Sequence, residues 1–198
     1  MPLQLESSNV FIRGNFNPYI FSPEWLTSQG VWEEQEVHLA LGATLGDGIQ
    51  FRSVNSDIEW SVSSSSLIIA TLGDAGTLAA SVMEKLPHTP VQAVGCNFVF
   101  ALASWDSDLV PKLGASSLLD LPSKYHAELV KWTGVFHLDE QRVDMAVACG
   151  NEGITVSFNH HRSVGTAEEA GAAAKRFLDN KALSVEMIGE ILRETVAK

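Results

Sequence analysis

Residues 91–103 read VQAVGCNFVFALA, and this uncharged stretch constrains the arrangement of the whole chain. It is too short for a membrane-spanning helix, which needs about 20 apolar residues. Read with the two-residue period of a β-strand, its larger side chains share one face: Val94, Cys96, Phe98, Phe100 and Leu102. The other face carries mostly small or medium-sized side chains. A strand of this kind is expected inside a sheet, with a covering layer on both sides.

The composition is that of an ordinary globular protein. The chain has 198 residues, of which 45% are hydrophobic and 19% are charged. A chain of this length can bury a sizeable core, so we expect one compact domain over 1–198. It has two possible halves, 1–103 and 125–198, joined by an irregular connection over 104–124.

The formal net charge of −11 favours some partners over others. Such a field repels the phosphates of nucleic acids and anionic membrane surfaces. The basic residues are also dispersed rather than gathered in a stripe. We therefore expect neither nucleic acid nor a membrane as a partner, and instead expect another protein or self-association.

Two cysteines, Cys96 and Cys149, bear on the compartment. Each lies in an apolar run that is predicted to be a strand, where a free thiol usually behaves as a small hydrophobic group. Two cysteines form no disulfide framework, and the first six residues, MPLQLE, do not resemble a signal peptide. We expect a cytoplasmic protein, with a disulfide between the two cysteines only if their strands are neighbours.

Alternating apolar residues and turn signals predict the other strands, which are expected at 10–16, 36–45, 49–54, 58–62, 67–72, 129–138, 143–149 and 154–164. Several of the connections have the length of hairpins, which favours antiparallel neighbours. The predicted fold class is α+β. It consists of a mostly antiparallel sheet of about eight strands in two halves, with helices packed on it and two C-terminal helices.

Four polar residues are expected to begin helices. Ser22, Asp74, Thr166 and Ser184 can each accept a hydrogen bond from a free N–H group of a first helical turn. Glu169 follows Thr166 by three residues, which makes a capping box. Thr166 and Ser184 are thus predicted to start the two C-terminal helices.

The densest polar cluster, 159–162, ends the last predicted strand and reads NHHR. His160 and His161 are adjacent in a strand and therefore point to opposite faces, so they cannot bind one metal ion together. The sequence also contains no zinc-ligand spacing, no Gly-x-Ser-x-Gly nucleophile motif and no glycine-rich phosphate loop. We assign no catalytic residue, no metal ligand and no cofactor, and keep His160, His161 and Arg162 as candidate binding residues.

Other candidate binding residues lie in a strand and in loops. Asn97 sits in an apolar strand and is expected to bond a neighbouring loop or helix end, because an unpaired buried amide costs roughly 1–3 kcal/mol. Trp32 and Trp105 lie in predicted loops, the latter close to Asp106 and Asp108. Loop tryptophans near acids are typical of protein-binding surfaces, although such a ring can equally fold back onto the core.

Two functions follow as hypotheses. The first is a non-catalytic protein that acts through protein–protein interaction, as a subunit or regulator of a larger assembly, using its loops or its helical face. The alternative is a small enzyme or ligand-binding domain with a pocket between sheet and helices near Asn97, His160 and His161.

Overall fold

The computed structural model describes residues 3–32, 37–41, 49–53, 57–102, 129–138, 140–150 and 153–196. Within these ranges it describes the side chains of residues 3–32, 57–102, 131–138, 140–148 and 153–190. The predicted connection over 104–124 lies outside the described residues.

The described strands form one nine-stranded sheet with the order β2-β3-β4-β5-β1-β6-β9-β8-β7. Every neighbouring pair is antiparallel. The strands are β1 (Leu3–Gly14), β2 (Val37–Leu41), β3 (Ile49–Ser53), β4 (Glu59–Val62), β5 (Ser66–Ala70), β6 (Val91–Leu102), β7 (Leu129–Leu138), β8 (Gln141–Gly150) and β9 (Gly153–Ser163). The predicted α+β fold with a mostly antiparallel sheet is confirmed.

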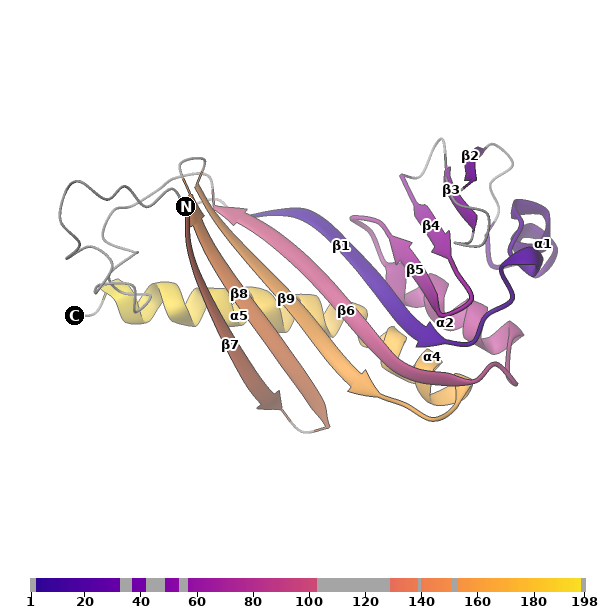
Figure 1. Ribbon diagram of the computed structural model, residues 1–198. Helices are drawn as coiled ribbons and strands as arrows, with labels where there is room; N and C mark the ends of the chain where they lie inside the picture. The colour runs from indigo at the N-terminus through magenta and orange to yellow at the C-terminus, as the bar shows by residue number, and fades with distance from the viewer. Residues whose placement is uncertain are drawn as a thin grey trace.

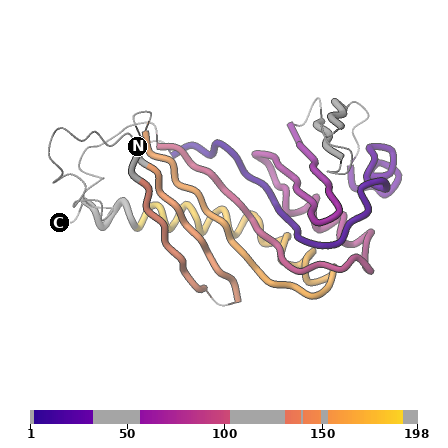
Figure 2. The backbone as a smooth tube through the Cα atoms, in the orientation of Figure 1, coloured from indigo at the N-terminus to yellow at the C-terminus, as the bar shows by residue number. Residues whose placement is uncertain are grey.

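The sheet is continuous because strands far apart in the sequence pair at its centre. Figure 2 traces β1 between β5 and β6, and β6 pairs on its other side with β9. The pairing of β6 with β9 joins the two predicted halves of the chain. Strand β8 pairs with β9 and with β7, so β9 separates β8 from β6.

Three helices gather on one side of this sheet (Figure 1): α2 (Ala75–Lys85), α4 (Ala167–Lys175) and α5 (Phe177–Val196). Two short helices, the 3-10 helix η1 (Pro18–Ile20) and α1 (Pro23–Ser28), follow β1 along the chain. In Figure 1, α2, α4 and α5 lie behind the strands, and α5 runs behind β9, β8 and β7. We call this side the covered face. No described helix crosses the opposite side of β1, β6, β9 and β8, which we call the open face.

Three of the predicted helix caps are confirmed. Ser22 Oγ accepts from the backbone N–H of Trp25 at 3.1 Å. Asp74 accepts from the N–H groups of the first turn of α2, and Thr166 Oγ1 accepts from the N–H of Glu169 at 3.1 Å. These short polar side chains therefore fix the starts of α1, α2 and α4 locally.

The fourth predicted cap is wrong. Helix α5 begins at Phe177, so Ser184 lies in its interior rather than at its start. Its hydroxyl donates to the carbonyl oxygen of Asn180, one turn earlier, at 2.9 Å. A serine can occupy a helix interior when it bonds back to the preceding turn in this way. Ser184 also forms a hydrogen bond with His160 of β9.

The prediction for residues 91–103 is partly wrong. As expected, residues 91–102 form an interior strand, β6, between β1 and β9. On the covered face Cys96, Phe98 and Phe100 are almost fully buried. On the open face Asn97 and Val99 are only half-buried. Neighbouring strands shield them from the sides, but no described helix covers them from above (Figure 1). Only one side of the strand is covered by described helices.

Close packing of α2 against α4 and α5 completes the core. A Cβ added to Gly76 of α2 would lie 2.3 Å from the carbonyl oxygen of Ala174 and 2.4 Å from Cβ of Phe177. The aromatic ring of Phe177 in turn packs on Phe98 with the ring centroids 4.8 Å apart. The missing side chain of Gly76 therefore allows α2 to approach the end of α4 and the start of α5 closely.

Candidate functional site

His160 and His161 point to opposite faces, as predicted. His160 lies on the covered face with only 2% of its surface exposed, whereas His161 is half-buried on the open face. His160 does not sit at a sheet edge, because β9 is an interior strand. The two rings therefore have different surroundings and cannot serve one site together.

His160 bonds to helix α5. Its Nε2 lies 2.7 Å from Ser184 Oγ, and the hydroxyl proton of Ser184 is donated to the carbonyl oxygen of Asn180. Ser184 Oγ is thus the acceptor and His160 Nε2–H the donor. A histidine that activates a serine nucleophile needs the reverse arrangement, with its ring nitrogen accepting the hydroxyl proton. This buried pair is suited to holding α5 against the sheet.

Burial also keeps His160 uncharged. Desolvation lowers the pKa of its imidazole from 6.5 to about 4. Its other nitrogen, Nδ1, has no hydrogen-bond partner among the described residues. The ring is therefore neutral at pH 7, and one of its polar atoms is buried at a free-energy cost.

Cys96 lies beside His160 on the covered face, since the two residues are paired in the register of β6 and β9. It is a free, buried cysteine, and β9 separates its strand from the strand of Cys149. Burial raises the pKa of the Cys96 thiol to about 11, against the opposing effect of a hydrogen bond from the Asn180 side chain. At neutral pH the thiol is protonated and unsuited to nucleophilic chemistry.

The open face carries a row of polar side chains that crosses four strands. The register aligns Asn9 of β1, Asn97 of β6, Asn159 of β9 and Asp144 of β8. Asn97 Nδ2 donates to Asn9 Oδ1 at 2.8 Å. Asn97 therefore has a hydrogen-bond partner, but the predicted location of this partner is wrong, because it lies on a neighbouring strand.

Glycine allows the amides of this row to lie close to the strand backbone. A Cβ added to Gly95 would lie 3.0 Å from Asn159 Oδ1 and 3.8 Å from Asn97 Nδ2. The next pairs of the same register place His161 opposite Gly95 and Arg142. Arg142 Nε forms an exposed ion pair with Asp144 Oδ1 at 2.8 Å, of the kind that contributes little to stability.

Arg162 lies in a small hollow between the end of β9 and helix α4. It forms an ion pair with Glu140, and the hollow, of about 320 Å³, is also lined by Ser163, Val164, Glu169, Ala172 and Ala173. Glu169 Oε2 is already engaged, because it accepts from the N–H of Gly165 at 2.7 Å. Arg162 is thus separated from the open-face row and neutralised locally.

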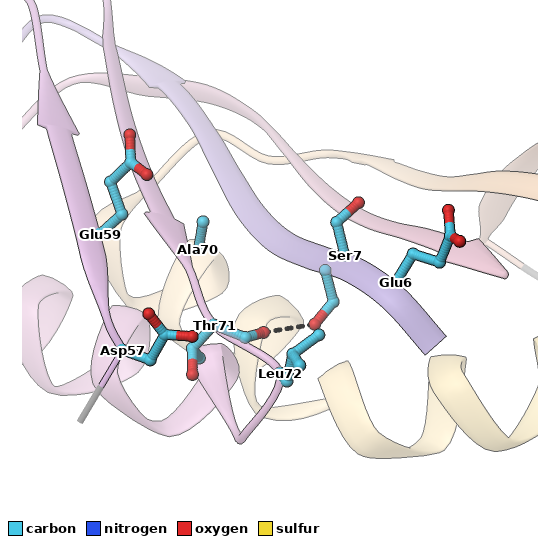
Figure 3. A pocket seen from close by; sticks show the side chains of 8 residues that line it. Glu6, Ser7, Asp57, Glu59, Ala70, Thr71 and Leu72 are labelled. Carbon is cyan, nitrogen blue, oxygen red and sulfur yellow. Dashed lines mark hydrogen bonds between the residues drawn. The ribbon is translucent and has the colours of Figure 1, made fainter. Parts of the chain in front are cut away.

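A second hollow was not foreseen from the sequence. Figure 3 shows it beside β1, β4 and β5, lined by Glu6, Ser7, Ser8, Asp57, Glu59, Ala70, Thr71 and Leu72, with a volume of about 220 Å³. Ser8 Oγ donates to the carbonyl oxygen of Thr71 at its base. Across the part of the chain that the structure describes, no group of three or more histidine, cysteine or acidic residues is arranged to hold a metal ion.

The loop candidates divide into two groups. Trp32 is only 5% exposed, and its ring packs on that of Trp60 with centroids 6.0 Å apart. Trp32 therefore folds onto the core and cannot act as an exposed anchor. Trp105, Asp106 and Asp108 lie outside the described residues.

The outer strand β7 carries an exposed apolar surface that sequence reasoning missed. Trp132, Val135 and Leu138 are 38%, 53% and 38% exposed. Among the described strands β7 pairs only with β8 and ends the sheet. The one signal in the sequence is that residues 129–138, LVKWTGVFHL, contain no acid in an acidic chain. We call Trp132, Val135 and Leu138 the β7 patch.

Comparison with known proteins adds no assignment. No protein-family model matches the chain, and no curated protein matches it either. Among the described residues no helix is both long enough and apolar enough to cross a membrane. The candidate surfaces are thus distinguished by their own geometry and chemistry.

Proposed function

We propose that this protein is a non-catalytic subunit or regulator that binds another protein along the outer strand β7. The observation that carries the proposal is the β7 patch. Trp132, Val135 and Leu138 expose large apolar side chains on a strand at the end of a sheet. They lie on both faces of the strand, so together they line the edge that a further strand would extend.

Backbone groups at a sheet edge support the same proposal. An outer strand presents N–H and C=O groups to any further strand, and natural proteins usually protect such edges with charges, prolines or short lengths. Strand β7 has ten residues, and Lys131 is the only one of them that is charged at neutral pH with His137 counted as neutral. An added strand would gain hydrogen bonds from the backbone and apolar contacts from the side chains.

The other candidate surfaces are less suited to binding. The covered-face cluster of His160, Ser184 and Cys96 is buried, and the hollow at Arg162 contains an ion pair that already neutralises the guanidinium. A free thiol at Cys96 also suits a reducing compartment, in keeping with a cytoplasmic location for the proposed subunit.

Affinity capture from the native source tests the proposal. The full chain, its Val135→Lys variant and a Leu178→Lys control serve as baits; Leu178 is equally exposed but lies on α5. A specific partner should bind the wild type and the control alike, and should bind Val135→Lys at least about tenfold more weakly, since a buried lysine replaces an apolar contact. Equal binding by all three folded baits would contradict the use of β7.

A second candidate function is recognition of a polar small molecule on the open face. The aligned amides of Asn9, Asn97 and Asn159 next to His161 favour it. A thermal-shift screen with sugars, nucleotides and amino acids tests this alternative. A ligand that stabilises the wild type but not His161→Ala or Asn159→Ala would support it over the first.

A further inference from the structure

Building on the proposed function of β7, we propose that its partner is a second copy of this chain. The two β7 strands would pair antiparallel about a two-fold axis that passes through Val135 and lies normal to the sheet. The spacing of the β7 patch carries this inference, because Trp132 and Leu138 each lie three residues from Val135.

Strand geometry places these residues on matching faces. Residues that are paired across strands share a face. Trp132 and Leu138 pair with Val147 and Gln141 of β8, on the covered face, and Val135 pairs with Asp144, on the open face. Each copy therefore offers two apolar side chains on one face and a central one on the other.

Two-fold pairing about Val135 matches apolar with apolar at every member of the patch. Trp132 would face Leu138 of the partner subunit, and Val135 would face Val135 of the partner subunit. Thr133 would face His137 of the partner subunit, which pairs polar with polar. A register shifted to be centred on Gly134 or Phe136 would place Val135 against threonine or histidine instead.

Charge also favours β7 as the meeting point of two copies. Each chain carries a net charge of −11, so two copies repel one another over most approaches. Strand β7 contains no acid and one lysine. The β7 strands themselves therefore add no acid-to-acid repulsion, and added salt should strengthen the dimer by screening the charges elsewhere.

The size of the edge sets the expected affinity. Ten antiparallel residues extend about 34 Å, and a sheet with side chains on both faces is about 10 Å thick, so the edge presents roughly 340 Å². This is below the roughly 800 Å² per partner of standard interfaces. We therefore expect a weak, reversible dimer rather than a permanent one.

Sedimentation velocity and cysteine cross-linking test the inference. The full chain should show a reversible monomer–dimer equilibrium that shifts towards dimer with concentration and salt, and Val135→Lys should weaken it at least about tenfold. With diamide as oxidant, Val135→Cys should form an intermolecular disulfide. Thr133→Cys is the matched control, since the proposed register separates its two copies by four residues, about 14 Å along the strand.

Each other result overturns the inference. Cross-linking of both variants would contradict the register, and a dimer that Val135→Lys leaves intact would place self-association elsewhere. A chain that stays monomeric up to about 100 μM, at high salt, would exclude a second copy as the partner. In that case, capture of a different protein by the wild type but not by Val135→Lys would still support the proposed function. If no such protein is captured, both the proposed function and this inference are contradicted.

Discussion

The two faces of the sheet treat neighbouring residues in opposite ways. His160 is enclosed by α5 and by aromatic rings, and burial holds it in the neutral form. His161, the next residue, lies on the open face beside the polar row. On the covered face, burial of apolar side chains stabilises the fold, and polar groups such as His160 can bond only to neighbouring protein groups. The open face keeps polar groups that are available to other molecules.

Truncating an aromatic ring on the covered face should have the largest effect. Phe98→Ala removes a fully buried ring that packs on Phe177 and His160, so we expect a loss of about 4 kcal/mol in the free energy of unfolding. Val99→Ala, on the open face of the same strand, should cost about 1 kcal/mol or less. Urea unfolding followed by circular dichroism measures both. Equal losses would mean that the two faces are equally buried in solution.

Acid should destabilise the protein through the covered face. The folded-state pKa of His160, about 4, lies below the unfolded value of 6.5. Between these values the unfolded chain binds the extra proton, so stability falls as pH decreases from 6.5 towards 4, by about 3 kcal/mol at most. His160→Phe should flatten this part of the profile relative to the wild type. An unchanged slope in His160→Phe would contradict this assignment.

The sequence predicted local features of this fold well. Residues such as Ser22 and Asp74 fix helix starts through bonds to their own first turns, and alternation along residues 154–163 placed His160 and His161 on opposite faces. The prediction that Ser184 begins a helix was wrong, because a serine has the same local preference for a helix start wherever it occurs. Its actual setting depends on His160, which the fold brings to it from β9.

The candidate surfaces depended on register and could not be predicted. Asn9 and Asn97 lie far apart in the sequence, and only the pairing of β1 with β6 aligns them. The hollow in Figure 3 likewise needs Glu6 of β1 and Glu59 of β4 to line one cavity across β5. The β7 patch required the strand order, because the sequence does not indicate which strand ends the sheet.

Removing one amide from the open face should have the smallest effect. Asn97→Ala deletes the hydrogen bond to Asn9 but leaves a half-buried amide that water can reach. We expect a loss of about 1 kcal/mol. Asn9→Ala should cost a similar amount, and the double variant should cost less than the sum of the two, because both single changes remove the same bond. Additive losses in thermal unfolding would show that the bond contributes nothing.

The position of β1 has a consequence for how the chain folds during synthesis. This first strand lies between β5 and β6, so both of its neighbours are made later than β1 itself. At translation rates of about 5–20 residues per second, roughly 3 to 10 s pass before β5 follows β1 out of the ribosome. During that interval an apolar segment containing Val10 and Ile12 has no partner strand. The nascent β1 segment therefore has to remain unpaired and protected from aggregation until β5 and β6 are available.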